Sequence, residues 1–443
     1  MDNSALLTDF YQLSMAYGYW QLGLDDQETV FHLFFRRMPK QGDYVVASGL
    51  QAVIDYLNQF RFTDDDIAYL KTIKNPTFSD EFLAYLKTLR FTGDIDAMPE
   101  GSIVFGNEPL LRIKASIILC QLLETPLINA LNFSSAVATT ATRMRTTAGN
   151  DVLFEFGLRR SQGPNGGLTA SRAAYLGGFD ATSNVLAGKY FDIPVVGTMA
   201  HSWVMSFDDE LTAFEAYARL IPENLVLLVD TYNTMQGVDH AIAVGKKSGL
   251  LKGIRLDSGD LGALSIAARE KLNQAGLFET KIFVSGDITE NRLIELKSMK
   301  APIDGWGVGT HLSTSYDQPA LDMVYKLGAI KKTNAWQYKL KISENHIKTS
   351  DPGILQVRRV FEKDKWKGDI IYHEDFGVPD CIDFKDLLIP IFRKGQLLNE
   401  QPSLHEKRQY CLEQVKQFNA SKGDGYSVKR EERLLELKRK LMR

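Results

Sequence analysis

Cysteine is scarce in this chain of 443 residues, which has only Cys120, Cys381 and Cys411 and no C-x-x-C pair. So few cysteines exclude a disulfide framework and suit a reducing compartment. With 44% hydrophobic residues, the chain can bury a core large enough to fold without disulfides or a structural metal. At roughly 150 residues per domain, its length predicts two or three domains.

An excess of charge of one sign is also absent. The chain has 52 lysines and arginines against 55 aspartates and glutamates, a formal net charge of −3. This balance argues against a general nucleic-acid-binding protein, because such proteins carry a basic surface. It leaves room for a local basic pocket that binds phosphate groups.

No long uninterrupted apolar run is present. The most apolar segment, residues 115–131, contains Gln121, Glu124 and Pro126, which predicts that it does not span a bilayer. The N-terminus carries Asp2 and Asp9 where a signal peptide would carry positive charge. We therefore expect a soluble, cytoplasmic protein that does not associate with a membrane.

Several common catalytic and nucleotide-binding motifs are missing as well. The sequence contains no G-x-x-x-x-G-K-[ST], no H-E-x-x-H and no G-x-S-x-G. Candidate functional residues therefore have to be found from their positions relative to predicted strands and helices.

What the middle third does contain is an alternation of short apolar runs with helical patterns, which is typical of βα units and a parallel sheet. Polar residues follow nearly every run, as in FEFGLRR, GTMAHS, VDTYNT, RLDSGD, VSGDIT and GVGTHL. In a barrel all strand ends meet at one mouth, whereas an open sheet concentrates such residues at one switch point. The pattern favours an irregular βα (TIM-like) barrel within an α/β fold. The predicted strands are residues 152–156, 193–197, 225–229, 253–256, 281–284, 305–308 and 323–327.

The regions on either side of the middle third have different sequence patterns. Residues 116–131 predict a helix with a kink or break at Pro126. After residue 334 alternating segments such as WQYKLKI predict strands, and residues 428–443 predict a basic amphipathic helix. We predict an N-terminal α/β domain over 1–130, a βα-barrel catalytic domain over 131–333, and a β-rich and helical C-terminal segment over 334–443 that packs on the N-terminal domain.

Two of the strand ends suggest phosphate binding. Arg159 and Arg160 precede a glycine-rich stretch at 163–167, and two guanidinium groups beside such a stretch suit phosphate capture. The alternative is a flexible surface loop. Gly309 and Thr310 follow another run, where backbone N–H groups and a hydroxyl could bind an anion. The alternative there is a plain tight turn.

Carboxylates follow two successive runs, with Asp257 and Asp260 after one and Asp287 after the next. Such groups could bind ribose hydroxyls, hold Mg²⁺ or act as an acid/base pair, and the alternative is helix capping. Arg255 projects to the same side as Asp257, because side chains two residues apart in a strand share a face. A cation and an anion at one strand end suggest recognition of a polar ligand.

His201, in the segment GTMAHSW, is the histidine best placed at the expected mouth. A structural or surface role is the usual alternative for a histidine. Thr198 and Ser202 flank it at a strand end, which favours a functional role. The residues alone thus predict a βα-barrel enzyme that binds a phosphorylated, hydroxyl-rich substrate and uses a histidine.

The same segments resemble the nicotinate phosphoribosyltransferase family. The resemblance implies an irregular, incomplete barrel beside an N-terminal α/β domain. It also implies that nicotinate and 5-phosphoribosyl 1-pyrophosphate (PRPP) are joined into nicotinate mononucleotide for NAD biosynthesis, with coupled ATP hydrolysis. The matching segments are LLTDFYQLSMAYGYW, FEFGLRRSQGP, AAYLGGFDATSNV, GTMAHSW, VDTYNT, GIRLDSGDL, SGDI, GWGVGTHLSTSYDQPA and KISENHIKTSDPG.

Residue by residue, the resemblance implies that His201 is phosphorylated by ATP and acts in catalysis with Arg255 and Asp257. Thr198 and Arg255 would hold the carboxylate of nicotinate, and Tyr11 would stack on the pyridine ring from the partner subunit of a homodimer. Mg²⁺ would arrive with the substrate, because no dedicated protein cage is evident. The remaining ribose, phosphate and pyrophosphate contacts would come from Arg159, Asp230, Asp257, Gly286, Asp287, Gly309 and Thr310.

Two alternatives remain open at this point. One is nicotinamide phosphoribosyltransferase, a relative with a serine and a lysine where this chain has Phe10 and Gln12. The other is a non-catalytic phosphoribosyl or nucleotide sensor on the same barrel. The intact set of His201, Arg255 and Asp257 argues against a sensor, because a sensor could lose any of them.

Overall fold

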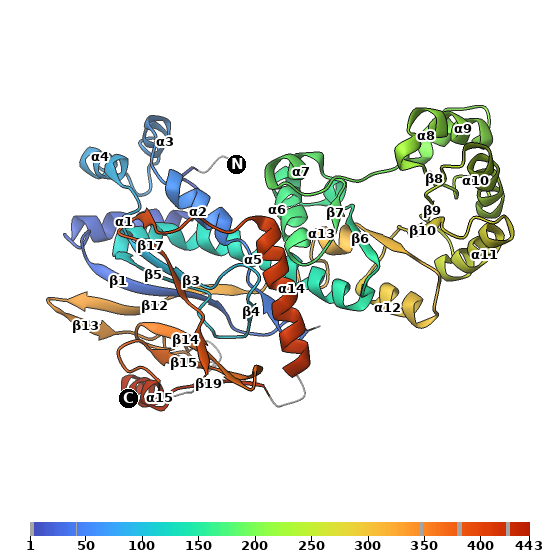
Figure 1. The fold of residues 1–443 in the computed structure, drawn as a ribbon. Helices are drawn as coiled ribbons and strands as arrows, with labels where there is room; N and C mark the ends of the chain where they lie inside the picture. Colours follow the sequence, from blue (N-terminus) through green and yellow to red (C-terminus); the bar gives the residue numbers. More distant parts are fainter. Residues whose placement is uncertain (1–3, 41, 345–348, 379–382, 422–425) are drawn as a thin grey trace. The chain divides into compact units, whose positions relative to one another are not determined.

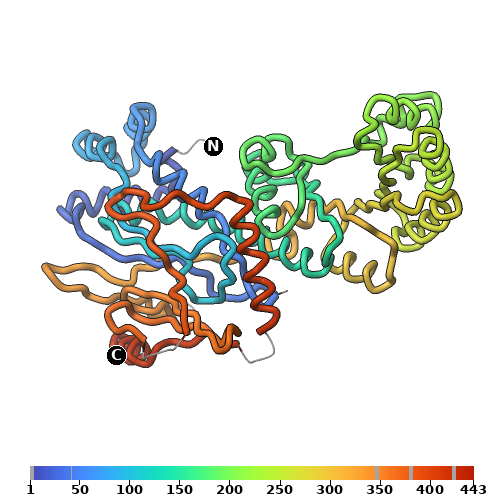
Figure 2. The backbone as a smooth tube through the Cα atoms, in the orientation of Figure 1, coloured from blue at the N-terminus to red at the C-terminus, as the bar shows by residue number. Residues whose placement is uncertain are grey.

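The structure, a computed structural model, describes residues 4–40, 42–344, 349–378, 383–421 and 426–443 (Figure 1). Cys381 and part of the KISENHIKTSDPG segment lie outside the described residues. The chain forms two compact units: a composite unit of Met1–Ala136 with Ala320–Arg443, and a central unit of Val137–Pro319. Figure 2 shows the chain starting in the composite unit (blue), passing through the central unit (green and yellow) and returning to the composite unit (orange and red).

The central unit is built on a parallel sheet with the strand order β7-β6-β11-β10-β9-β8. Strands β8 to β11 are neighbours in chain order, and so are β6 and β7. The last strand, β11, pairs with the first, β6, so that only β7 and β8 follow each other in the chain without pairing. That order is the order of a βα barrel left open at one joint. A closed barrel is therefore not confirmed, while the α/β class and the parallel sheet are. The strands are β6 (Val152–Glu155), β7 (Ala181–Thr182), β8 (Val226–Leu228), β9 (Gly253–Leu256), β10 (Lys281–Val284) and β11 (Gly305–Val308).

Two predicted strands of this sheet were wrong. In residues 193–197 the chain makes only an isolated bridge, Thr182 to Val195, and Pro194 has no N–H to donate to a ladder. Residues 323–327 belong to β12 (Met323–Lys332), which pairs antiparallel with β1 (Glu28–Phe35) in the composite unit. The predicted central domain of 131–333 therefore extends into a strand of the other unit's sheet.

Helices alternate with the strands of the central unit, and α9, α10 and α11 lie along β8, β9 and β10 (Figure 1). Asp260 accepts hydrogen bonds from the N–H groups of Gly262 and Ala263 and so caps α11. For this carboxylate, helix capping was the alternative to ligand binding. The glycine-rich stretch 163–167 forms the start of α6 instead of a loop. The helices are α6 (Gly163–Leu176), α7 (Val185–Phe191), α8 (His201–Met205), α9 (Glu210–Leu220), α10 (Thr234–Ser248), α11 (Leu261–Gln274), α12 (Glu290–Ser298) and α13 (Thr310–Ser313).

The composite unit contains an antiparallel sheet with the strand order β13-β12-β1-β5-β3-β17-β18. Because β17 (Ile389–Arg393) pairs with β3 (Asp94–Ala97), the C-terminal segment completes the sheet begun by the N-terminal segment. The other strands of this sheet are β5 (Leu111–Ser116), β13 (Ala335–Tyr338) and β18 (Gln396–Leu397). Smaller sheets are formed by β14 (Leu355–Glu362), β15 (Lys365–His373), β16 (Phe384–Asp386) and β19 (Ser427–Arg430), and by β2 (Val45–Val46) with β4 (Ile103–Val104).

The longest helix, α5 (Ile117–Ala148), runs through Pro126 without the predicted break. An interior proline costs a helix about 3 kcal/mol, and burial of Leu122, Leu123 and Leu127 in the core offsets this cost. By length and composition α5 could cross a membrane, but 61% of its most apolar window is buried inside the protein. The other helices are α1 (Phe10–Gln21), α2 (Leu50–Gln59), α3 (Asp64–Leu70), α4 (Asp80–Thr88), α14 (Leu404–Ser421) and α15 (Glu432–Met442).

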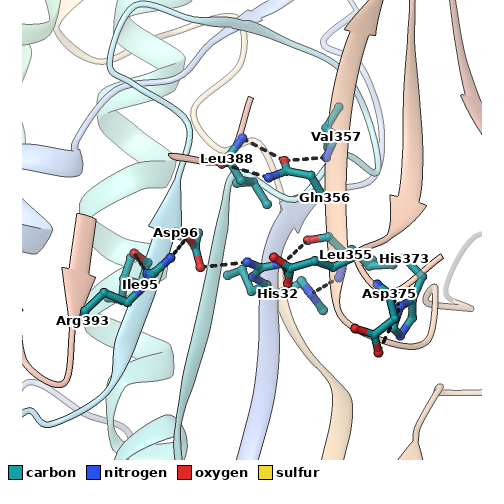
Figure 3. A network of polar contacts seen from close by, with 12 residues as sticks. His32, Ile95, Asp96, Leu355, Gln356, Val357, His373, Asp375, Leu388 and Arg393 are labelled. Atoms are coloured by element: carbon teal, nitrogen blue, oxygen red, sulfur yellow. Dashed lines mark hydrogen bonds and ion pairs between the residues drawn. The ribbon is translucent and has the colours of Figure 1, made fainter. Parts of the chain in front are cut away.

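A buried histidine, His32 on β1, lies in a polar network of the composite unit (Figure 3). Its Nε2 accepts the N–H of Leu355 at 3.1 Å, so the ring is held in its neutral form. Burial, together with nearby Arg112 and His373, lowers the pKa of His32 to about 3. Burial also lowers the pKa of His373. These histidine side chains therefore bind protons less readily in the folded protein than in the unfolded chain.

This arrangement predicts acid sensitivity of the fold. Between an unfolded pKa near 6.5 and the folded value of about 3, the unfolded chain binds the extra proton, so stability is full above pH 6.5 and falls as the pH falls. The contribution of His32 should drop by about 1.4 kcal/mol per pH unit within this window. Urea unfolding at about pH 7.5 and about pH 5.5 measures the loss. His32→Gln should flatten this pH dependence and the exposed His405→Gln should not; equal slopes in both variants would contradict the assignment.

Candidate active site

Five of the predicted functional residues lie after the carboxyl ends of the parallel strands of the central unit. Arg159 follows β6, Asp230 follows β8, Asp257 follows β9, Gly286 follows β10 and Gly309 follows β11. Carboxyl ends of neighbouring parallel strands lie at the same edge of a sheet. The hydrogen bonds below show which of these side chains the fold brings into contact.

Arg255, on β9, is joined to the segment that precedes α8. Its Nη1 donates to Thr198 Oγ1, and its Nη2 donates to the carbonyl of Met199 at 3.1 Å. Burial lowers the pKa of Arg255, and nearby Asp257 and Asp230 oppose this effect. Its Nε is buried and has no partner among the described residues. A largely buried guanidinium with a spare donor beside a threonine hydroxyl suits a planar anion.

Two carboxylates, Asp230 and Asp257, order the loop after β9. Asp230 Oδ2 accepts the N–H of Asp257 at 2.9 Å and the hydroxyl of Ser258 at 2.6 Å. Ser285, at the end of β10, donates to Asp257 Oδ1. Asp230 is buried, so it fixes the backbone that carries the more exposed Asp257.

His201, the first residue of α8, has one ring nitrogen held and the other facing a carboxylate. Its Nδ1 lies 3.1 Å from Thr231 Oγ1, and its Nε2 lies 3.9 Å from Asp257 Oδ2. The side chain is 40% exposed, so a ligand can reach Nε2. In the tautomer in which Nδ1–H donates to Thr231 Oγ1, Nε2 carries a free lone pair and can accept a phosphoryl group. Thr231 was not among the predicted residues, although it stands in the VDTYNT segment after β8.

Gly286 allows the loops after β9 and β10 to meet. Its φ is +89°, and a Cβ on this residue would lie 2.0 Å from the carbonyl oxygen of Asp257. Any side chain would therefore push the two loops apart. The neighbouring Asp287 is 86% exposed, and its Oδ1 lies 3.7 Å from Arg160 Nη1.

The two arginines after β6 take different positions. Arg160, which ends the 3-10 turn η1 (Leu158–Arg160), donates from Nη1 to Thr310 Oγ1 at 3.1 Å. Arg159 is exposed, and its charge is close enough to lower the pKa of Arg255. The sequence pattern indicated both arginines for phosphate capture, whereas the family resemblance implied only Arg159; in the structure it is Arg160 that contacts Thr310.

Tyr11 belongs to the composite unit, where it lies on α1 and is 51% exposed. Its hydroxyl accepts a hydrogen bond from Gln12 Nε2 at 3.2 Å. Partial burial and the nearby Glu124 raise its pKa, so the phenol stays protonated at neutral pH. The ring is thus held at its hydroxyl end while part of its surface remains accessible.

No group of three His, Cys, Asp or Glu side chains within the described ranges could hold a metal ion. Asp230 and Asp257 offer two carboxylates, and Asp230 Oδ1 is buried without a described partner. Asp230 Oδ2 and Asp257 Oδ1 already accept hydrogen bonds, and two carboxylates alone fall short of the oxygen ligands that Mg²⁺ needs. The described residues therefore do not form a dedicated Mg²⁺ cage.

Comparison with known proteins gives consistent matches over most of the chain. Residues 6–132 match the family model described as nicotinate phosphoribosyltransferase N-terminal domain, and residues 152–365 match the nicotinate phosphoribosyltransferase family. A nicotinate phosphoribosyltransferase of Bacillus subtilis is 42% identical over 94% of this chain and 89% of its own length. One of Caenorhabditis elegans is 40% identical over 81% of this chain and 74% of its own length.

Solved structures agree with the sequence matches. The human nicotinic acid phosphoribosyltransferase has a TM-score of 0.84 and 30% identity, covering 98% of this chain and 100% of that chain. A nicotinate-nucleotide pyrophosphorylase of Pyrococcus furiosus has a TM-score of 0.75 at 23% identity, covering 94% of this chain and 96% of that chain. The second likeness concerns the fold alone.

Proposed function

The chain belongs to the nicotinate phosphoribosyltransferase family, whose members are enzymes, and we propose that it joins nicotinate to PRPP, giving nicotinate mononucleotide and pyrophosphate. The observation that carries the proposal is the largely buried guanidinium of Arg255 beside the Thr198 hydroxyl, at the strand end that also presents Asp257. A fixed cation and a hydroxyl donor recognise a carboxylate, and nicotinate carries one.

In the proposed reaction the pyridine nitrogen of nicotinate bonds to the anomeric carbon of PRPP, and the bond from that carbon to pyrophosphate breaks. Positive charge builds on the ribose ring as the bond breaks, so catalysis depends on positioning and charge stabilisation. The carboxylate of Asp257 supplies negative charge near the ribose. Gly309 and Thr310 would hold the 5′-phosphate, with Arg159, Gly286 and Asp287 around the ribose and pyrophosphate.

ATP is the proposed co-substrate, and His201 the residue that it phosphorylates. The support is the geometry of the ring, with Nδ1 held by Thr231 and an accessible Nε2 facing Asp257. Mg²⁺ would come bound to the pyrophosphate and ATP phosphates and reduce their charge. We place the enzyme in the cytoplasm, in pyridine nucleotide synthesis; Cys120 and Cys411 are free thiols, which suits a reducing compartment.

The stoichiometry of ADP tests this coupling. Wild-type protein incubated with nicotinate, PRPP and ATP should release ADP in step with nicotinate mononucleotide, and addition of nicotinate and PRPP should accelerate ADP release. Chromatographic quantification of both products follows the two reactions in one sample. ADP release that ignores nicotinate and PRPP, or mononucleotide formation with ATP left intact, would contradict coupling.

The active form is proposed to be a homodimer in which Tyr11 of one subunit stacks on the pyridine bound by its partner. The support is the accessibility of the ring, which lies on α1 beside Leu7, Phe10 and Met15, whose apolar side chains are also exposed. An aromatic ring stacked on a flat pyridine supplies contact area and orientation at low entropic cost. The alternative is that Tyr11 serves only the structure of its own chain.

Mixing two inactive variants separates these possibilities. Tyr11→Ala and His201→Ala chains should each be inactive, whereas a heterodimer of the two contains one site with both residues intact. Random re-pairing should then restore about a quarter of the full activity, by the two-fold symmetry of the assembly. Activity is measured on the unseparated mixture, and differential tags on the two chains verify that heterodimers have formed. Verified heterodimers without activity, or a fully active monomer, would rule out the shared site.

A further inference from the structure

Glu155, the last residue of β6, is a buried carboxylate outside the set of residues assigned above. It is 1% exposed, and its partners are one backbone amide and two hydroxyls. Within the described residues it forms no ion pair with a cationic side chain. A buried charge is costly unless hydrogen bonds satisfy it, so this carboxylate must be held in one position by its three donors.

In the hydrogen bonds around Glu155, Asn184 donates to two hydroxyl groups, and these donate to the carboxylate. The side-chain amide of Asn184 donates to Ser171 Oγ at 3.1 Å, and its backbone N–H donates to Thr182 Oγ1 at 3.0 Å. The two hydroxyls then donate to Glu155 Oε2, at 2.8 Å from Ser171 and 2.6 Å from Thr182. Asn184 thus donates to both hydroxyls, which leaves their protons for acceptors: Thr182 donates to Glu155, and Ser171 Oγ lies within hydrogen-bond distance of both Glu155 and the carbonyl oxygen of Gly167, at 2.8 and 2.9 Å.

The other carboxylate oxygen holds the turn that carries the arginines. Glu155 Oε1 accepts the N–H of Gly157, and the carbonyl of Gly157 accepts the N–H of Arg160 at 2.9 Å. Gly157 packs so closely against α13 that a Cβ on it would lie 2.3 Å from Ser313 Oγ. The turn therefore has little freedom, and its position sets where Arg160 meets Thr310 on α13.

We propose that Glu155 is a positioning residue for PRPP binding, which acts by fixing the turn from Gly157 to Arg160 so that Arg160 and Thr310 together meet a phosphate group of PRPP. This inference rests on the proposed function, because it takes PRPP as the polyanionic substrate at these strand ends. It assigns to Arg160 a direct contact with phosphate and to Glu155 an indirect effect through the backbone. Neither residue is assigned a role in recognising the pyridine.

The test compares Glu155→Gln with Asp180→Asn, a change at a second carboxylate that holds β6 and that also pairs with Arg145 at 2.5 Å. In Glu155→Gln an amide replaces a carboxylate, and at least one of the three donors loses its acceptor. Asp180→Asn makes the same change at a residue whose Oδ2 accepts the N–H of Leu153 at the start of β6. Titration calorimetry with PRPP alone gives its Kd without turnover. We expect the Kd and the KM for PRPP to rise about 10-fold in Glu155→Gln, with the KM for nicotinate within about 2-fold of wild type.

A double-mutant cycle distinguishes positioning from a general structural defect. Arg160→Ala should weaken PRPP binding alone, and adding it to Glu155→Gln should weaken binding by much less than the product of the two separate effects. The milder Ser171→Ala removes one donor to Glu155 and should raise the Kd about 3-fold. Any of three results would overturn the proposal. The Kd for PRPP could be unchanged in Glu155→Gln and Ser171→Ala, the effects of residues 155 and 160 on binding could be independent, or Asp180→Asn could weaken PRPP binding as much as Glu155→Gln does. Failure of wild-type protein to form mononucleotide would contradict the proposed function instead, whatever the Kd series shows.

Discussion

Replacement of His201 by asparagine is expected to reduce ATP hydrolysis by at least about 1,000-fold while a slow, ATP-independent transfer to nicotinate persists. Asparagine can still form a hydrogen bond with Thr231, but it has no ring nitrogen to accept a phosphoryl group. A phosphorylated imidazole would add negative charge near the pyrophosphate site and bias substrate binding and product release. Loss of that charge therefore removes the coupling and leaves the transfer chemistry.

The measurement is incorporation of acid-labile phosphate from γ-labelled ATP, together with ADP release. His240, which is in the same unit and pairs with Glu210 at 2.9 Å, supplies the control. His240→Asn should leave ATP hydrolysis per folded molecule within about 2-fold of wild type. Acid-labile phosphate on the His201→Asn protein would show that another residue is the acceptor.

Nicotinate is expected to be used with a kcat/KM at least about 1,000-fold above that of nicotinamide. Arg255 offers a spare N–H donor and a permanent charge to a carboxylate, whereas the neutral amide of nicotinamide would leave the largely buried charge poorly paired. Arg255→Gln should therefore lower the efficiency for nicotinate by on the order of 100-fold or more and shrink the preference to about 10-fold.

Steady-state kinetics on both pyridines at saturating PRPP measure this preference. Arg219, an exposed arginine in the last turn of α9, provides the matched control, and Arg219→Gln should keep the wild-type ratio. Comparable efficiencies of the wild-type protein on the two pyridines would contradict the role of Arg255 and favour a nicotinamide phosphoribosyltransferase.

The parallel strands that were predicted correctly are those with strong local signals. Residues 253–256, 281–284 and 305–308 combine short apolar runs with polar residues directly after them, and they form β9, β10 and β11. β7 has two residues and was missed, because its pairing with β6 comes from tertiary contacts and not from its own pattern. Residues 323–327 have the same local pattern as a βα strand, and only their long-range pairing with β1 reveals the other sheet.

The residues of the candidate site were likewise predicted only in part from the sequence. Position at a strand end singled out Asp257 and, on the strand itself, Arg255, whereas His201 was placed after residues 193–197, which do not form a strand of the sheet. The structure places His201 near Asp257 and Thr231, and it joins Arg255 to Thr198. Glu155 was missed, because a glutamate at the end of an apolar run gives no local sign of three buried donors around it. Hydrogen-bond partners far apart in sequence cannot be read from spacing.

Formation of nicotinate mononucleotide by the purified chain tests the central claim most directly. Nicotinate, PRPP, Mg²⁺ and ATP are incubated with the protein, and mononucleotide and pyrophosphate are quantified against samples that lack PRPP, lack ATP or contain nicotinamide in place of nicotinate. The account predicts equal amounts of mononucleotide and pyrophosphate from nicotinate, faster formation with ATP, no product without PRPP and little from nicotinamide. Folded, PRPP-binding protein that forms no mononucleotide from nicotinate would contradict it.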